Sequence, residues 1–334
     1  GEEMAIFKER SFYLAVVLAL SASLLGKYLS LLPGLRIVGA MVIALIFGML
    51  FQLVPQVLNQ ARGGIGFISN KFLRAGIILL GFRLNLKALA DSGVKTIGIA
   101  LFVVILTIAL VSLFSRWLKV EESLMLLTAC GCGICGAAAV MGVSPQVKAK
   151  TTDSVLAVAV VAILGTVFTL IEVTLRAPLG LTPEQYGVMT GASLHEIAHA
   201  IAAAGAGGDV ALEVGLITKL SRVLLLAPVS LIVGIYYQRR HLSADEKKAN
   251  LPIPWFMAGF LATSAMGSFL TIPEVITSNL VSLAYILLGM AMAALGMNVS
   301  FGVIIKRGGK IFLAATMASA ILMVVSYCIA ILFF

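Results

Sequence analysis

The stretch "LLTACGCGICGAAAVMGVSP", residues 126–145, decides how this chain folds. It is apolar enough to lie in a membrane, yet residues 128–139 are all small apart from Ile134. Glycine costs a helix about 1 kcal/mol relative to alanine, so Gly133 and Gly136 predict non-helical backbone between about residues 129 and 137. Small residues also serve close helix packing, and that alternative stays open.

A broken membrane helix exposes backbone N–H groups at the positive end of a helix dipole. Such groups suit an anion near the middle of the membrane. We therefore expect Gly133, Cys135, Gly136 and Ala137 to contribute to an anion site. The same run also reads G-x-G-x-x-G, but no strand precedes it, so a dinucleotide site is not expected.

The composition predicts an all-α polytopic membrane protein. Of the 334 residues, 60% are hydrophobic and 12% are charged, whereas a soluble domain carries about 25% charge. About 20 apolar residues span a bilayer as a helix. By that rule there are eleven candidate spans, near 11–32, 37–53, 66–83, 94–115, 122–143, 153–175, 184–205, 209–237, 254–271, 275–298 and 311–334. We predict an N-terminal cytoplasmic segment, 1–10, and a single transmembrane domain, 11–334.

The net charge of +9 predicts orientation rather than nucleic-acid binding, because the basic residues are scattered in short loops. With eleven alternating spans and the N-terminus inside, fifteen Lys and Arg residues fall in cytoplasmic loops and seven fall outside. This assignment puts Arg176 inside and Lys148 and Lys150 outside. We therefore expect a cytoplasmic N-terminus.

Five ionisable residues lie within two consecutive candidate spans: His195, Glu196, His199, Lys219 and Arg222. Charge at membrane depth usually faces a protein interior or a water-filled cavity. On continuous helices, His195 and His199 would share one face, and so would Lys219 and Arg222. The two cations need an anion, which is Glu196 in a structural ion pair, a substrate, or each in turn. We predict that the cations bind substrate, while the two histidines and Glu196 couple or gate transport.

Residues 195–199 also spell H-E-x-x-H, the signature of helical zinc proteases. Such a site needs a third ligand, and the remaining histidine, His241, lies in a basic polar loop. Cys130, Cys132 and Cys135 could bind a soft metal with His195 or His199, but buried cysteine usually acts as a small hydrophobe. We expect no metal, no cofactor and no enzyme activity.

One internal echo pairs "LLGFRLNL" (79–86) with "LGMNVSF" (295–301). On the predicted topology the two segments end on opposite sides, as in the inverted repeats of secondary transporters. Chance similarity of two Leu-Gly helix ends is the alternative. Asn298 is also among the candidate substrate-binding residues.

Several motifs occur together along residues 35–330. They are "GFRLNL" (81–86), "ICGAAAV" (134–140), "HEIA" (195–198), "TKLSRVLLLAP" (218–228), "IPWF" (253–256) and "AMAALGMNV" (291–299). With these motifs the chain resembles the bacterial sulfate exporter family of inner-membrane proteins. The resemblance implies the neighbourhood of the bile acid symporter and sodium/proton antiporter folds, with inverted repeats and broken helices.

The resemblance also implies that six residues occupy the family's motif positions: Cys135, Gly136, His195, Glu196, Lys219 and Arg222. Cys130 and Cys132 are additional here, and His199 stands where relatives often have glutamine. That second departure weakens the zinc interpretation.

We therefore expect a secondary active transporter of a small anion in the bacterial inner membrane. Sulfate, a sulfonate or another small oxyanion would be the substrate, with a proton or sodium ion as the coupling partner. A passive anion channel and an intramembrane zinc protease are the alternatives. No G-x-x-x-x-G-K-[ST] motif is present, which argues against ATP-driven transport. A homodimer stays open, and the lipid bilayer is the surrounding partner.

Overall fold

The protein is described by a computed structural model that covers residues 9–33, 35, 40–241, 255–298 and 301–334. These residues form helices and no strand, which confirms the all-α prediction. Most of the predicted cytoplasmic segment, residues 1–8, lies outside the described residues. The chain divides into two compact units, residues 1–85 with 259–300 and residues 86–258 with 301–334. The prediction of one transmembrane domain stays a prediction.

The first unit is a bundle of closely packed helices. Its elements are α2 (Arg10–Leu29), α4 (Ala40–Leu50), η1 (Phe51–Leu53), α5 (Pro55–Phe67), the π-helical η2 (Ile68–Phe72), α6 (Leu73–Leu80), η3 (Gly81–Arg83), most of α15 (Trp255–Phe269) and α16 (Glu274–Met297). A Cβ added to Gly48 would lie 2.1 Å from the Ala293 carbonyl oxygen, and one on Gly296 would lie 2.3 Å from that of Leu45. Glycine therefore lets the backbones of α4 and α16 touch.

The two echo segments begin on α6 and α16, which pack against each other within this unit. A Cβ on Gly76 would meet Leu288 and the Ala284 carbonyl, whereas Ile68 shares a core cluster with Met297. Along one direction, the residue numbers rise from η2 into α6 and fall along α16. The two helices therefore run antiparallel. Opposite direction is what an inverted repeat requires.

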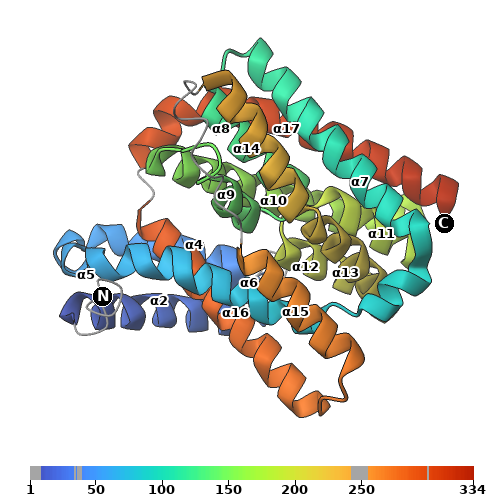
Figure 1. The fold of residues 1–334 in the computed structure, drawn as a ribbon, viewed down its shortest axis with the longest axis horizontal. Helices are drawn as coiled ribbons and strands as arrows, with labels where there is room; N and C mark the ends of the chain where they lie inside the picture. The colour runs from blue at the N-terminus through green and yellow to red at the C-terminus, as the bar shows by residue number, and fades with distance from the viewer. Residues whose placement is uncertain (1–8, 34, 36–39, 242–254, 299–300) are drawn as a thin grey trace. The chain divides into compact units, whose positions relative to one another are not determined.

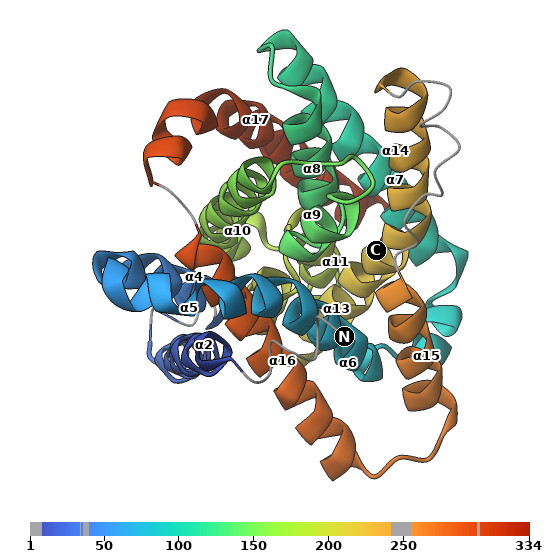
Figure 2. The same ribbon diagram turned by 60° about the vertical axis from the view of Figure 1, so that its left-hand side comes forward.

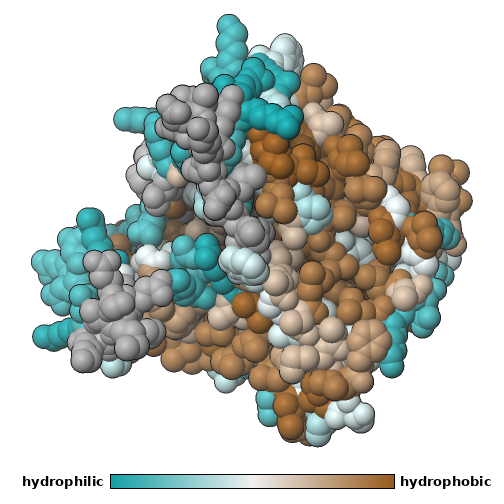
Figure 3. All heavy atoms as spheres, viewed as in Figure 1, coloured by the Kyte–Doolittle hydropathy of each residue, from teal (hydrophilic) through white to brown (hydrophobic). Residues whose placement is uncertain are grey.

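The second unit contains nine helices among its described residues. They are α7 (Leu86–Trp117), α8 (Glu122–Gly133), α9 (Ala137–Val143), α10 (Thr151–Leu179), α11 (Pro183–Ser193), α12 (Ile197–Ala206), α13 (Asp209–Leu224), α14 (Leu226–His241) and α17 (Phe301–Phe333). Helices α7 and α17 present large exposed apolar side chains such as Phe102, Ile105, Val324 and Leu332. The corresponding surface is brown in Figure 3. Exposed apolar surface of this kind suits contact with lipid.

The first broken segment is a hairpin that returns to the end from which it started. Helix α8 stops at Gly133, residues 134–136 are not helical, and α9 begins at Ala137. Arg307 contacts Glu121 at 3.0 Å, just before the hairpin, and Asp153 at 3.1 Å, just after it. Glu121 and Lys150 also line one cavity of about 250 Å³. Residues 122–150 therefore form a hairpin, with its break inside the range that the glycines predict.

A second broken hairpin is formed by α11 and α12 around residues 194–196. A Cβ on Gly207, after α12, would lie 2.6 Å from the Tyr186 ring, near the start of α11. Both ends of this hairpin are thus close together. Helix α10 joins the two hairpins, so they enter the unit from opposite ends of that helix. Figure 1 shows this for α8 and α9 against α11 and α12, and Figure 2 for α8 and α9 against α11.

The two hairpins correct the predicted membrane topology. Segments 122–143 and 184–205 turn back rather than cross, because α8 has 12 residues and reaches about 18 Å, short of a hydrocarbon core of about 30 Å. Seven helical stretches among the described residues are long and apolar enough to span. They are Arg10–Leu29, Pro55–Arg83, Leu86–Trp117, Thr152–Leu179, Asp209–His241, Glu274–Met297 and Ile305–Phe333. The count of eleven is not reproduced.

With the two hairpins in place, the basic residues of the second unit are distributed unequally between its two ends. Lys148 and Lys150 lie at the same end of the unit as Glu121, and Arg176 lies at the opposite end of α10. The prediction from the sequence places Arg176 inside with the residues near Glu121, and Lys148 and Lys150 outside, so the structure reverses both placements. Among the described basic residues, those at the Glu121 end are Arg116, Lys119, Lys148, Lys150, Arg239, Arg240, Lys306, Arg307 and Lys310. Lys87, Lys95 and Arg176 belong to the other end. This distribution favours the Glu121 end as cytoplasmic.

Single-cysteine labelling of membrane vesicles tests this topology. We expect Lys150→Cys and Arg116→Cys to react with an impermeant maleimide from one side and Thr182→Cys from the other, because the first hairpin does not cross. The background carries Cys328→Ser, since Cys328 is exposed whereas the three other cysteines are buried. Labelling of positions 116 and 150 from opposite sides would contradict the hairpin.

Candidate functional site

Arg222 joins the tips of the two hairpins. Its Nε and Nη2 donate to the carbonyl oxygens of Gly133 at 2.8 and 2.5 Å and of Cys132 at 2.8 Å, at the end of α8. Its Nη1 donates to the carbonyls of Ala192 at 2.7 Å and Leu194 at 2.9 Å, at the end of α11. The planar fork of arginine suits this double contact. The fully buried side chain thus satisfies carbonyls that two helix ends leave without an intrahelical partner.

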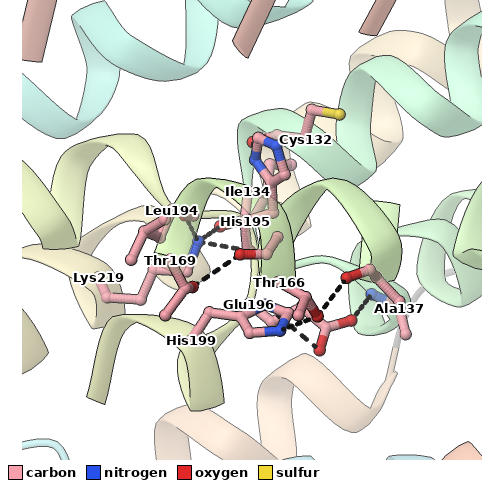
Figure 4. Close-up of polar contacts among 12 residues, drawn as sticks. Cys132, Ile134, Ala137, Thr166, Thr169, Leu194, His195, Glu196, His199 and Lys219 are labelled. Atoms are coloured by element: carbon pink, nitrogen blue, oxygen red, sulfur yellow. Dashed lines mark hydrogen bonds and ion pairs between the residues drawn. The ribbon is translucent and has the colours of Figure 1, made fainter. Parts of the chain in front are cut away.

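Lys219, one turn earlier on α13, makes the same kind of bridge. Its fully buried Nζ donates to the carbonyl oxygens of Ile134 and Leu194, both at 2.7 Å, and of His195 at 2.6 Å. Figure 4 shows the ammonium group among these three residues. An ammonium has three donors, and all three have an acceptor here.

The site therefore places two cations against two negative helix ends. The C-terminus of a helix carries about −0.5 elementary charge, and both α8 and α11 end at the cations. Lys219 and Arg222 share one face of α13, as their spacing predicts. Direct binding of a substrate by these two residues stays a prediction.

Glu196 occupies the other side of the first hairpin's tip. Its Oε1 accepts the Ala137 backbone N–H at 3.4 Å. A Cβ added to Gly136 would lie only 2.3 Å from the Glu196 Cγ, and the φ of +72° at Gly136 is a conformation that glycine favours. Glycine at 136 thus both turns the chain and makes room for the buried carboxyl group.

His199 faces the second oxygen of this carboxyl group. Its Nδ1 lies 4.0 Å from the Glu196 Oε2, and neither atom has a hydrogen-bond partner. Its Nε2 lies 3.3 Å from the Thr166 Oγ1, whose hydroxyl hydrogen bonds to the Ala162 carbonyl at 3.0 Å. The Thr166 oxygen is then left to accept, so the His199 Nε2 carries the hydrogen and Nδ1 is a free acceptor. Figure 4 shows this chain of contacts.

His195 does not share a helix face with His199, contrary to the expectation from spacing. It lies in the break before α12, where Glu196 is the N-cap residue. Its Nδ1 donates to the Cys132 carbonyl at 3.2 Å, and its Nε2 contacts the Ser319 Oγ at 2.9 Å. Both ring nitrogens therefore hold the hairpin tips and α17 together.

The H-E-x-x-H residues are consequently not arranged as on a protease helix. The break at 194–196 separates the two histidines, whose rings contact different neighbours. In the part of the chain that the structure describes, no group of three His, Cys, Asp or Glu residues is placed to hold a metal ion. Cys130, Cys132 and Cys135 are buried beside the tip.

The second unit thus brings together most of the predicted residues. They are Gly133, Cys135, Gly136, Ala137, His195, Glu196, His199, Lys219 and Arg222. Asn298 belongs to the first unit, where its backbone N–H caps α16 by donating to the Leu295 carbonyl. The proposed ion pair of Glu196 with either cation is not formed among the described residues: the ionisable side chain that the Glu196 carboxyl group faces is His199, at 4.0 Å.

Glu172 is a buried ionisable residue that was not among the candidates predicted from the sequence. Glu172 lies in α10 with no exposed surface, and its Oε1 is hydrogen-bonded to the Ser193 hydroxyl at the end of α11. Its Oε2 has no hydrogen-bond partner. The signal was present in the sequence, because "TLIEVTLR" (169–176) puts one acid inside an apolar span.

Comparison with known proteins places the chain among bacterial membrane proteins. The family model described as "Conserved hypothetical protein 698" matches residues 13–315. A "UPF0324 membrane protein" of Lactobacillus johnsonii is 53% identical, over 99% of this chain and 100% of its own length. Namesakes in Bacillus cereus and Bifidobacterium longum are 46% and 45% identical, over 96% and 95% of this chain and 91% and 94% of their own length. No solved structure matches.

Proposed function

Since the chain belongs to the family described as conserved hypothetical protein 698 and is a multi-pass membrane protein, we propose that it is a secondary transporter of a small anion. One observation supports this most: two broken hairpins from opposite ends meet at Lys219 and Arg222. Irregular backbone within a membrane occurs where it is buried in protein or lines a water-filled cavity. Broken helices of this kind form the substrate and ion sites of many secondary transporters.

The charge of the site favours an anion. The two cations contribute two positive charges, while the C-terminal ends of α8 and α11, about −1 together, are balanced by the N-terminal ends of α9 and α12, about +1 together. With Glu196 ionised the sum is about +1. With Glu196 protonated the sum is about +2, which attracts an anion more strongly.

Proton coupling follows from this balance. Glu196 and His199 offer two unpartnered buried acceptor atoms 4.0 Å apart, so a proton has a place to bind there. Proton binding and anion binding then favour each other, and the two move in the same direction. Lys219 and Arg222 act through their charge, because carbonyl oxygens already occupy their donors. Sulfate or a sulfonate is the substrate class that the resemblance to sulfate exporters suggests.

Replacement of Glu196 by glutamine tests the coupling. In proteoliposomes with the membrane potential clamped, wild-type protein should accumulate radiolabelled sulfate or an alkylsulfonate along an imposed pH gradient. One pH unit is about 1.36 kcal/mol per proton, so Glu196→Gln should lower the accumulation ratio about tenfold per unit of gradient while exchange continues.

Glu213→Gln is the matched control, because Glu213 is exposed on the helix that carries the cations. It should behave like wild type. Accumulation driven by a sodium gradient alone would show that sodium, not the proton, is the coupling ion. Anion flux that never exceeds the equilibrium distribution of the anion would indicate a channel. Wild-type protein that moves neither anion would refute the proposal of a sulfate or sulfonate transporter.

A further inference from the structure

Hydrogen-bond donors are too few around Glu172 to support an ionised carboxylate. A carboxylate has two oxygens with about four lone-pair sites. Among the described residues, the Ser193 hydroxyl is the one group bonded to the side chain, and Oε2 has no partner. The Ser193 hydroxyl also contacts the Met189 carbonyl at 2.7 Å, and it has a single hydrogen to give.

The neutral acid fits these contacts better. A protonated Glu172 donates from Oε1 to the Ser193 oxygen, and the Ser193 hydroxyl then donates to the Met189 carbonyl. Every contact has one donor and one acceptor in this arrangement. An isolated buried carboxylate is costly enough that such a group is usually neutral instead.

In the part of the chain that the structure describes, no cationic side chain forms an ion pair with Glu172. The charged or titratable groups that act on Glu172 are Arg222 from α13 and Tyr186 from α11. The donors of Arg222 are bonded to the hairpin carbonyls, and the Tyr186 hydroxyl donates to the backbone carbonyl of Glu172 at 3.4 Å. Arg176, one turn along α10, lies over the Tyr186 ring at 5.9 Å.

We infer that Glu172 is a second proton-binding site, protonated in this conformation, whose proton crosses the membrane with the one on Glu196. The inference rests on the proposed transport function and adds the number of protons that move with each anion. Ser193, which binds Glu172, ends α11 just before the break at 194–196, and Glu196 is the last residue of that break, so both carboxyl groups lie at the same hairpin tip. A doubly charged oxyanion moving with two protons would be carried without net charge.

Infrared spectroscopy tests the proton without any substrate. The spectrum of wild-type protein minus that of Glu172→Gln, at neutral pH in detergent, should contain the C=O stretch of a protonated carboxylic acid, which shifts in heavy water. Glutamine keeps the shape and can still donate to Ser193, so the fold should persist. A difference spectrum with carboxylate bands alone would overturn the inference.

Stoichiometry tests the role in transport. With sulfate as the probe and the potential clamped, wild-type accumulation should change about a hundredfold per pH unit, and Glu172→Gln should leave about tenfold, since each proton contributes one factor of ten. Glu172→Asp keeps an ionisable group and should retain the wild-type dependence at a lower rate. Glu184→Gln, an exposed carboxyl on α11, is the control and should match wild type.

The outcomes separate the two proposals. An unchanged hundredfold dependence in Glu172→Gln, or a wild-type dependence of tenfold, would refute the second proton while leaving transport intact. Absence of any sulfate or sulfonate flux in wild-type protein would refute the transport proposal. The infrared experiment would then still decide the protonation of Glu172.

Discussion

Arg222→Met should remove most of the folded protein. The substitution leaves the buried Gly133 and Ala192 carbonyls without the guanidinium that binds them. An unsatisfied buried polar group costs about 1–3 kcal/mol, so we expect a loss of about 3–5 kcal/mol, a large fraction of the about 5–15 kcal/mol by which folded proteins are stable. The measurement is the yield of monodisperse protein together with its melting curve.

Two variants sharpen this experiment. Arg222→Lys keeps the charge but lacks the planar fork, so it should bridge fewer carbonyls and melt between wild type and Arg222→Met. Arg239→Met, at an exposed position on α14, should melt like wild type. Normal folding of Arg222→Met would show that the contacts to the hairpin carbonyls contribute little.

A double variant distinguishes two ways in which Lys219 could be held, by backbone carbonyl oxygens or by an ion pair with Glu196. If Lys219 were held by Glu196, removing both charges together would restore stability. Because the Nζ of Lys219 is bound by three carbonyls, Lys219→Met with Glu196→Gln should remain as unstable as Lys219→Met alone. Recovery in the double variant would favour the ion pair.

Gly136→Ala should be the second severe change. Its φ of +72° and ψ of −131° cost a non-glycine residue about 1–3 kcal/mol, and the added methyl group would overlap the Glu196 side chain for about another 1–3 kcal/mol. Displacement of Glu196 from the Ala137 N–H should also lower the accumulation ratio about tenfold per pH unit, as in Glu196→Gln, in any protein that folds. Melting curves and the flux assay measure the two effects.

Gly205→Ala is a control for which we expect the opposite effect on stability. Gly205 lies in α12 with open space around its Cα, so alanine should stabilise the helix by up to about 1 kcal/mol. A Gly136→Ala variant as stable as Gly205→Ala would mean that the tip of the first hairpin tolerates a side chain.

Some features of this protein follow from the sequence alone. The low charge and high apolar content predicted a helical membrane protein, because such a chain cannot present enough polar surface to water. The glycines around Ile134 predicted the first break, since glycine disfavours a helix locally. Lys219 and Arg222 stood out as charges in an apolar segment, and their three-residue spacing placed them on one helix face.

Tertiary structure decided the rest. A hairpin and a membrane span have the same apolar composition, and contacts such as those of Arg307 with Glu121 and Asp153 distinguish them. The break at Leu194–Glu196 has no glycine of its own, and it separates His195 from His199. The cations bind carbonyls up to 90 residues away in sequence, such as that of Cys132 with Arg222. Backbone carbonyls are present at every residue, so no sequence pattern marks the ones that a folded chain leaves unpaired and brings to a buried charge.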